Sequence, residues 1–131
     1  MRSKILVADD SDVMRTTLVA LFRLARPEAE VLEASDGQDA IYMAMEHAPD
    51  IIVLDGEMPI MNGFQAAQHL RAMAITARIP LIGISAETGE NPIVLGLQKL
   101  CNEFWAKPVP MDRMLAFIDQ VMEQKRFAAA S

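Results

Sequence analysis

The sequence predicts an α/β domain built on a doubly wound, five-stranded parallel sheet, and two observations predict it. Short apolar runs alternate along the chain with longer stretches in which apolar residues recur at helical spacing. Several of the apolar runs also end on a polar residue. A parallel sheet carries helices on both faces, and its ligands bind beyond the carboxyl ends of the strands. The polar strand ends therefore mark the expected site.

Five apolar runs are the predicted strands: Lys4–Ala8, Ala29–Ala34, Ile51–Asp55, Pro80–Ser85 and Glu103–Lys107. The third, "IIVLD", is apolar up to its last residue, which is typical of a strand buried on both faces. Asp55 at its end is costly to bury unless another group pairs with its charge. A strand that ends in this way indicates a functional carboxylate.

The first three helices are predicted from caps and apolar stripes. Ser11 and Asp36 are candidate N-caps of the first two helices. Asn62, with Gln65 three residues later, resembles a capping box that starts the third. The residues expected to face the core are Val13, Met14, Thr17, Leu18, Leu21 and Phe22 in the first helix, Ile41, Ala44 and Met45 in the second, and Phe64, Ala67 and Leu70 in the third.

Two further elements follow the fourth and fifth strands. The segment "TGENPIVLGLQKL" contains Pro92 and Gly96, which predict a short or irregular element. The last helix has the clearest apolar stripe, formed by Met111, Met114, Leu115, Ile118, Val121 and Met122. We expect residues 1–126 to form one domain, followed by a tail at 127–131.

Length and composition exclude several classes of protein. The 131 residues suit one domain with a single core, and the hydrophobic content of 52% excludes a disordered chain. No stretch approaches the roughly 18 apolar residues of a membrane span, and the N-terminus becomes acidic too early for a signal peptide. Cys101 is the only cysteine, so no disulfide can form within the chain, and we expect a cytoplasmic protein in a reducing compartment. Cys101 itself is expected to be a small core residue. With a net charge of −6 and no run of Lys or Arg, it is not expected to bind nucleic acid or membranes.

The polar residues at the strand ends make a coherent chemical set. Asp9, Asp10 and Asp55 should meet at one edge of the sheet, and three such carboxylates cannot all stay ionised without a cation. Their hard oxygen ligands suit Mg²⁺. Lys107 adds a positive charge for an oxyanion, and Ser85 adds a hydroxyl donor. The set fits phosphoryl transfer onto Asp55 as the nucleophile.

Each of these residues also has an ordinary structural explanation when taken alone. Asp9 and Asp10 could cap the first helix, and Ser85 and Lys107 could be a plain strand end and a solvated lysine. The two histidines, His47 and His69, lie in helical stretches without a metal or catalytic partner and are expected at the surface. The functional interpretation therefore depends on the residues acting together.

Four segments together closely resemble the response-regulator receiver domain of two-component signalling. They are "VADD" with Asp9–Asp10, "LDGEMPIMNG" with Asp55, Pro59 and Gly63, "ISA" with Ser85–Ala86, and "KP" with Lys107–Pro108. Their order and spacing match those of the family over nearly the whole chain. The resemblance implies a flavodoxin-like, three-layer sandwich with strand order 2-1-3-4-5, and it implies a cis peptide bond between Lys107 and Pro108.

The resemblance also implies a role for each site residue. Asp55 becomes the phosphorylated residue, and Mg²⁺, for which Mn²⁺ can substitute, becomes the cofactor. The implied metal ligands are Asp10 and Asp55 directly, Asp9 through water and Glu57 through its backbone carbonyl. The implied phosphate-binding and switch residues are Ser85, Ala86, Lys107 and Phe104. Glu57 and Glu87 each lie two residues beyond a strand end, where we expect them to flank the mouth of the site and to tune the phosphoryl lifetime.

The implied function is that of a phosphoacceptor module and not of an enzyme with a separate substrate. A histidine kinase or histidine phosphotransfer protein supplies the phosphoryl group, and phosphorylation and dephosphorylation are self-catalysed. The signal leaves through the face formed by the fourth helix, the fifth strand and the fifth helix, toward a downstream protein or a fused effector domain. Leu100, Cys101, Trp105 and Val109 depart from the usual family residues beside that face.

Two alternatives remain open from the residues. An aspartyl-phosphate hydrolase of the haloacid dehalogenase class would need a second Asp two residues after Asp55 and Thr or Val two further on. Glu57 and Pro59 stand at those positions and break the pattern. A pseudo-receiver that only binds partners would be expected to lack an acid or the lysine, and all are present here.

Overall fold

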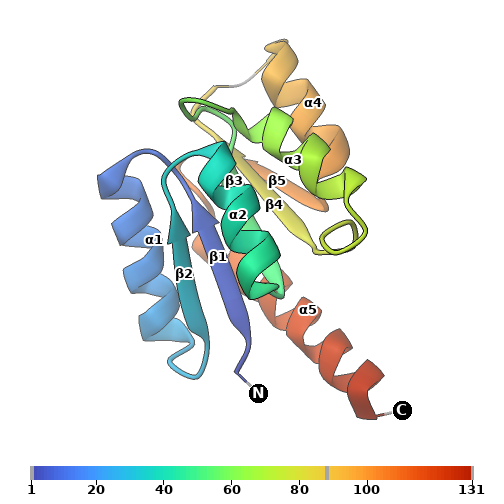
Figure 1. Cartoon of the computed structure of the whole chain (residues 1–131). Helices are drawn as coiled ribbons and strands as arrows, with labels where there is room; N and C mark the ends of the chain where they lie inside the picture. Colours follow the sequence, from blue (N-terminus) through green and yellow to red (C-terminus); the bar gives the residue numbers. More distant parts are fainter. Residues whose placement is uncertain (1, 88, 131) are drawn as a thin grey trace.

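The computed structural model describes residues 2–87 and 89–130 and contains one parallel sheet between two layers of helices (Figure 1). The sheet order is β2-β1-β3-β4-β5, which confirms the predicted fold class and strand order. The strands are β1 (Lys4–Ala8), β2 (Glu30–Ala34), β3 (Ile51–Asp55), β4 (Leu81–Ser85) and β5 (Glu103–Ala106). The helices are α1 (Asp12–Ala25), α2 (Gly37–His47), α3 (Gly63–Ala72), α4 (Pro92–Leu100) and α5 (Met111–Ala130).

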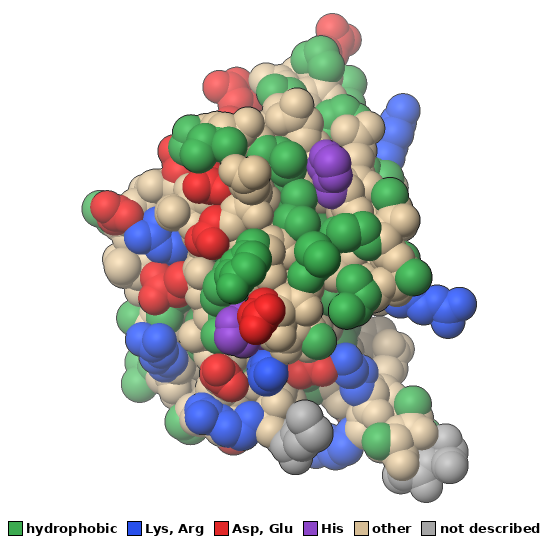
Figure 2. Space-filling model, in the orientation of Figure 1, with side chains coloured by type: hydrophobic (Ala, Val, Ile, Leu, Met, Phe, Trp, Pro, Cys, Tyr) green, Lys and Arg blue, Asp and Glu red, His purple; other side chains and the backbone are tan. Residues whose placement is uncertain are grey.

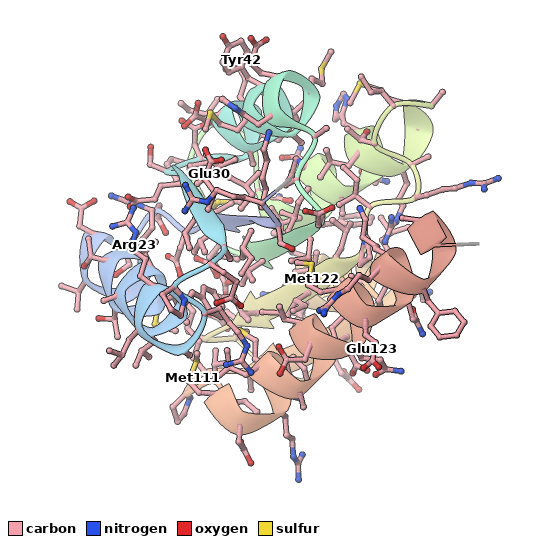
Figure 3. The ribbon with its side chains drawn as sticks, turned by 90° about the horizontal axis from the view of Figure 1, so that it is seen from below. Arg23, Glu30, Tyr42, Met111, Met122 and Glu123 are labelled. Atoms are coloured by element: carbon pink, nitrogen blue, oxygen red, sulfur yellow. The ribbon has the colours of Figure 1, made fainter. Side chains whose placement is uncertain are left out.

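Each face of the sheet has its own hydrophobic core. Alternate residues of β1 point to opposite faces, so Ile5 packs with α1 and α5 whereas Leu6 packs with α2, α3 and α4. All five residues of β3 are buried, as its continuous apolar run predicted. The view from below in Figure 3 shows Met122 on the side of α5 that faces the sheet, where it packs against the first core. Tyr42 lies on the outer side of α2 and is exposed.

The caps of the first helices are confirmed, but part of their predicted inner faces is wrong. Ser11 accepts a hydrogen bond from the backbone N–H of Met14, as an N-cap should. Val13 is 77% exposed, and Thr17 and Leu21 are exposed as well. The residues of α1 that are buried are Leu18, Val19 and Phe22. Apolar residues occur on two sides of α1, so the spacing alone could not decide which side faces the sheet.

Helix α2 shows the same kind of difference. Its cap at Asp36 is confirmed, since the side chain accepts a hydrogen bond from the backbone N–H of Asp39. Ala44 is buried as predicted, whereas Met45 is exposed. Ala40 is the second buried alanine of this helix. Two small residues let α2 lie close against β1 and β2, which leaves no room for a longer side chain on that face.

The element predicted before β5 to be short or irregular is a short but regular helix, since the nine residues of α4 make it the shortest of the described helices. Pro92 occupies its first turn, where the missing N–H costs nothing, and Asn91 caps it by accepting from the backbone N–H groups of Ile93 and Val94. Gly96 has a packing role, since a Cβ atom there would lie 2.6 Å from the ring of Phe64 on α3. Helix α4 therefore packs closely on α3 through its glycine.

Helices α3 and α5 follow their predicted patterns. The capping box between Asn62 and Gln65 is present in both directions. Gly63 is required at the start of α3, because a Cβ atom there would lie 2.2 Å from the backbone oxygen of Asp55. In α5 the buried residues are Met114, Ile118 and Val121, and the helix continues as far as Ala130, past the end of the sheet (Figure 1). Among the described residues, no helix is long and apolar enough to span a membrane.

Candidate functional site

Three carboxylates meet at the carboxyl ends of β1 and β3. Asp9, Asp10 and Asp55 each place an oxygen within 4.8 Å of the others. Asp9 is completely buried and Asp55 is 2% exposed, whereas Asp10 is exposed. The two strands are direct neighbours in the sheet, so their ends lie side by side. Figure 2 shows acidic side chains gathered at the upper left, over the end of the sheet where the strands finish. The predicted meeting of the three acids is present in the structure.

Lys107 supplies the positive charge of the cluster. It follows β5, and its backbone N–H donates to the carbonyl oxygen of Ser85 at 2.8 Å. Its Nζ atom lies 3.1 Å from Oδ2 of Asp9 and 3.5 Å from Oδ1 of Asp55. The peptide bond between Lys107 and Pro108 is cis, as the resemblance predicted. One ammonium group thus pairs with two carboxylates of a cluster of three.

Burial and the excess of negative charge in the cluster shift the pKa values of Asp55 and Lys107. Burial, helped by the negative charge of Asp9, raises the pKa of Asp55 to about 8, against a lowering influence of Lys107. Burial also lowers the pKa of Lys107, but the charges of Asp55 and Asp9 outweigh it and the net shift is upward. The cluster therefore has too little positive charge to balance its carboxylates.

The donor set fits a hard divalent cation such as Mg²⁺. Carboxylate oxygens are the ligands that Mg²⁺ prefers, and the exposed side of Asp10 leaves room for the waters that this ion keeps. A second observation comes from Glu57, whose buried Oε2 atom has no hydrogen-bond partner among the described residues. A buried oxygen of this kind is costly unless a cation or a proton satisfies it.

The side chain of Glu57 makes a contact that the sequence did not predict. The hydroxyl of Ser85 donates a hydrogen bond to its Oε1 atom at 2.5 Å, and the backbone N–H of Glu87 donates to the same atom at 3.0 Å. The Glu87 N–H also contacts the Ser85 Oγ atom at 2.9 Å. The side chain of Glu87 is exposed, as expected for the mouth of the site. The neighbouring positions of β3 and β4 were the signal that could have indicated this contact, because they bring Glu57 beside Ser85.

The other predicted switch residues lie on β4 and β5. Ala86 follows Ser85 and is exposed. Phe104 is half-buried beside Gly83, where a Cβ atom would lie 2.8 Å from its ring. Trp105 points to the opposite face of the sheet and packs against the core beneath α1 and α5. Phe104 and Trp105 are adjacent in the chain but contact different layers.

The remaining polar candidates lie away from the acids. His69 is exposed on α3, and His47 is half-buried at the end of α2. Burial raises the pKa of Cys101 to about 12, so it stays a neutral thiol, half-buried against the core on the α4 side. A cavity of about 570 Å³, with Arg26 and Asp119 in its lining, lies between the ends of α1 and α5 at the other end of the sheet.

Comparison with known proteins gives clear relatives. The family model of the response regulator receiver domain matches residues 5–119. The chain is 32% identical over 120 residues to the protein PilH of Pseudomonas aeruginosa, and the match covers 92% of this chain and 98% of PilH. It is 31% identical over 131 residues to the alkaline phosphatase synthesis transcriptional regulatory protein PhoP of Bacillus subtilis, where it covers 100% of this chain and 53% of PhoP. The chain thus spans about half the length of PhoP.

Solved structures of receiver domains have the same fold as this chain. The crystal structure of the receiver domain of the sensor histidine kinase PA1611 from Pseudomonas aeruginosa, which holds a magnesium ion in its active site cleft, matches with a TM-score of 0.83. That match covers 94% of this chain and 99% of the other at 22% identity, so it bears on the fold alone. The family match over most of the chain and the relationship to PilH show that this chain belongs to the response regulator receiver domains of two-component signalling.

Proposed function

We propose that this receiver domain accepts a phosphoryl group on Asp55 from a phosphohistidine of a histidine kinase or phosphotransfer protein. The observation that carries the proposal is the position of Asp55, buried at the end of β3 between two further acids and the Lys107 ammonium. In the reaction, the P–N bond of the phosphohistidine breaks and a P–O bond to a carboxylate oxygen of Asp55 forms. The histidine nitrogen leaves with the electron pair of the broken bond.

Asp10, Asp55 and the backbone carbonyl of Glu57 are the proposed direct ligands of Mg²⁺, and Asp9 acts through water. When bound, the ion neutralises charge that collects on the phosphoryl oxygens. Mn²⁺, which also accepts oxygen ligands, is the expected substitute. The composition of the acidic cluster supports this assignment.

Lys107 and Ser85 are the proposed protein partners of the phosphoryl group. The Lys107 ammonium already lies 3.5 Å from the acceptor carboxylate, so it is placed to form an ion pair with a phosphoryl oxygen. The hydroxyl of Ser85 and the backbone N–H of Ala86 are the proposed hydrogen-bond donors. The protein thereby positions the group and balances its charge, and it needs no other catalytic side chain.

The proposed output runs from Ser85 along β4 to β5. Phe104 lies directly opposite Gly83 in the pairing of these strands, so a shift of the Ser85 segment changes the space available to its ring. The face formed by α4, β5 and α5 then presents a different surface to a downstream protein or a fused effector domain. Relatives such as PhoP, a transcriptional regulatory protein longer than this chain, support an output through another domain.

The test is to incubate the chain with acetyl phosphate and Mg²⁺ and to map the adduct by mass spectrometry. One phosphoryl group on Asp55, labile to hydroxylamine, is expected. Asp55→Asn should abolish labelling, whereas Asp12→Asn, which changes an exposed acid at the start of α1, should retain it. Full labelling of Asp55→Asn would refute the assignment, and an unlabelled wild-type chain would favour the pseudo-receiver.

A further inference from the structure

The carboxylate of Glu57 occupies two hydrogen-bond donors at the edge of the site. Both the Ser85 hydroxyl and the backbone N–H of Glu87 point to its Oε1 atom, at 2.5 and 3.0 Å. Hydrogen bonds to an ionised acceptor are among the strong ones in proteins. Ser85 is fully buried, so its hydroxyl has no bulk water as an alternative acceptor. Glu57 therefore binds firmly to the residue that we assign to the phosphoryl group.

The sheet places Glu57 in this position. Asp55 pairs with Ile84, and the N–H of Gly56 donates to the carbonyl oxygen of Ile84 at 2.8 Å, so the chain after β3 stays against β4. The next residue is Glu57, whose side chain reaches Ser85 one position beyond Ile84. The backbone N–H of Glu57 also donates to Oδ1 of Asp55, at 3.4 Å. Glu57 thus lies between the acceptor and the switch hydroxyl.

We infer that Glu57 is an internal competitor of the phosphoryl group, whose carboxylate must leave Ser85 before a phosphoryl oxygen on Asp55 can bind there. The inference rests on the proposed function. A hydroxyl has a single proton and donates to one acceptor at a time, so the carboxylate and the phosphoryl oxygen exclude each other at Ser85. Both are anionic, so they also repel each other across the site. Glu57 is a positioning residue that holds Ser85 in the unphosphorylated arrangement and takes it back when the phosphate is lost.

Glu87 provides a matched control for this role. Its carboxylate carries the same charge at the mouth of the same site, and it lies two residues after Ser85 as Glu57 lies two residues after Asp55. The Glu87 side chain is exposed, and the residue contributes its backbone N–H to the contact with Glu57. Loss of either side chain removes one negative charge, but only the loss of Glu57 frees the Ser85 hydroxyl.

The experiment measures the affinity for beryllofluoride, a phosphoryl mimic, in the presence of Mg²⁺ by calorimetry. Glu57→Ala should bind the mimic about tenfold more tightly than wild type, as expected for the loss of one competing hydrogen bond to a charged group. Glu87→Ala should show only the smaller gain that comes from its charge. In a Ser85→Ala background, Glu57→Ala and Glu87→Ala should become equal, because the hydroxyl for which Glu57 competes is absent. Glu57→Gln keeps the size of the side chain and should fall between wild type and Glu57→Ala.

Two results would overturn the inference. Equal gains in Glu57→Ala and Glu87→Ala would show that charge alone matters, and an advantage of Glu57→Ala that persists without the Ser85 hydroxyl would exclude competition at that group. Should Glu57→Ala fail to fold, the same comparison is made between Glu57→Gln and Glu87→Gln. A wild-type chain that neither binds the mimic nor becomes labelled on Asp55 would overturn the proposed function instead.

Discussion

The ammonium nitrogen of Lys107 lies 3.1 Å from a carboxylate oxygen of Asp9, a residue 98 positions earlier in the chain. The contact joins the end of β5 to the end of β1, across the two strands between them. Because Asp9 is fully buried, its charge needs partners, and it has this ammonium at one carboxylate oxygen and the backbone N–H of Ser11 at the other, at 2.9 Å. Lys107 is therefore in place before any phosphoryl group arrives. In the metal-free site it is one positive charge among several carboxylates, and this shortage affects their protonation and the stability of the fold.

The first prediction concerns pH. Burial and the charge of Asp9 raise the pKa of Asp55 from its ordinary 3.8 to about 8, so between these values the folded chain holds a proton that the unfolded chain has released. The metal-free protein should therefore lose stability as the pH rises from 4 toward 8. Asp55→Asn, which stays neutral, should be more stable than wild type at pH 8 by at least about 1 kcal/mol, since one pKa unit corresponds to about 1.4 kcal/mol.

Urea unfolding in the presence of a chelator, at several pH values, measures this effect. The difference between Asp55→Asn and wild type should shrink toward zero near pH 4. Asp112→Asn changes an exposed acid at the start of α5 and should follow the wild-type curve. A constant difference at all pH values would contradict the assignment of the titration to Asp55.

The second prediction concerns the metal. Asp10→Ala should abolish Mg²⁺ binding and phosphorylation by acetyl phosphate, because it removes one of the oxygen ligands of the acidic cluster. Asp10 is exposed, so stability in the absence of metal should not fall. Asp12→Ala, two residues further on, should keep both properties. Phosphorylation of the wild-type chain at an unchanged rate in excess chelator would contradict a role for the ion.

The third prediction concerns the lifetime of the phosphoryl group. Glu87 is exposed at the mouth of the site, where its carboxylate can accept a hydrogen bond from an attacking water and orient it. Glu87→Leu should therefore lengthen the lifetime several-fold, less than the 10²–10⁴-fold of a full general base, and Asp55 should still be labelled. The measurement is the loss of phosphate from purified phosphoprotein after the donor is removed. Glu90→Leu, an exposed acid further along the loop, is the control, and an unchanged lifetime in Glu87→Leu would discard the role.

The fourth prediction concerns the link between Ser85 and β5. Trp105 is the only tryptophan and packs on the α5 side of the sheet, opposite Phe104. Its fluorescence should change when beryllofluoride saturates the site, because a movement of β5 alters the packing on both faces. Ser85→Ala should reduce that change without removing Asp55 or Lys107. A fluorescence change of the same size in Ser85→Ala as in wild type would show that the Ser85 hydroxyl does not link the site to β5.

The fifth prediction concerns the packing of α4. In an isolated helix, Gly96→Ala would be stabilising by about 1 kcal/mol. In this fold it should instead lower the free energy of unfolding by about 1–3 kcal/mol, because the added methyl group meets the ring of Phe64. Urea unfolding measures the difference. Gln98→Ala, at an exposed position of the same helix, should be close to neutral. Phe64→Leu should restore tolerance of Gly96→Ala, and a stabilised single variant would contradict the contact.

The sequence was sufficient to predict the sheet and the meeting of its polar ends. Parallel strands place their carboxyl ends at one edge, so Asp9, Asp55 and Lys107 could be brought together from their positions at strand ends alone. The continuous apolar run of β3 was enough to identify a strand buried on both faces. These predictions depend only on the backbone and its periodicity.

The errors arose where the answer depends on side-chain packing. Val13 and Met45 belong to apolar patterns whose facing side is chosen by the sheet and not by the spacing. Gly96 weakens a helix in isolation but allows α4 to pack on α3. The contact of Glu57 with Ser85 joins two strand ends through side-chain reach, which no spacing along the chain records.

Strand β5 lies at the edge of the sheet and pairs with β4 alone. An edge strand can be displaced at the cost of a single ladder of backbone hydrogen bonds, whereas a displacement of β3 would break two. The same strand leads directly to Lys107, and it carries Phe104 on one face and Trp105 on the other. One of the two edge strands of the sheet is thus connected at its end to the lysine of the acidic cluster. A change in the electrostatic force on Lys107 would therefore pull on a strand that is held by one ladder and that contacts both layers of helices.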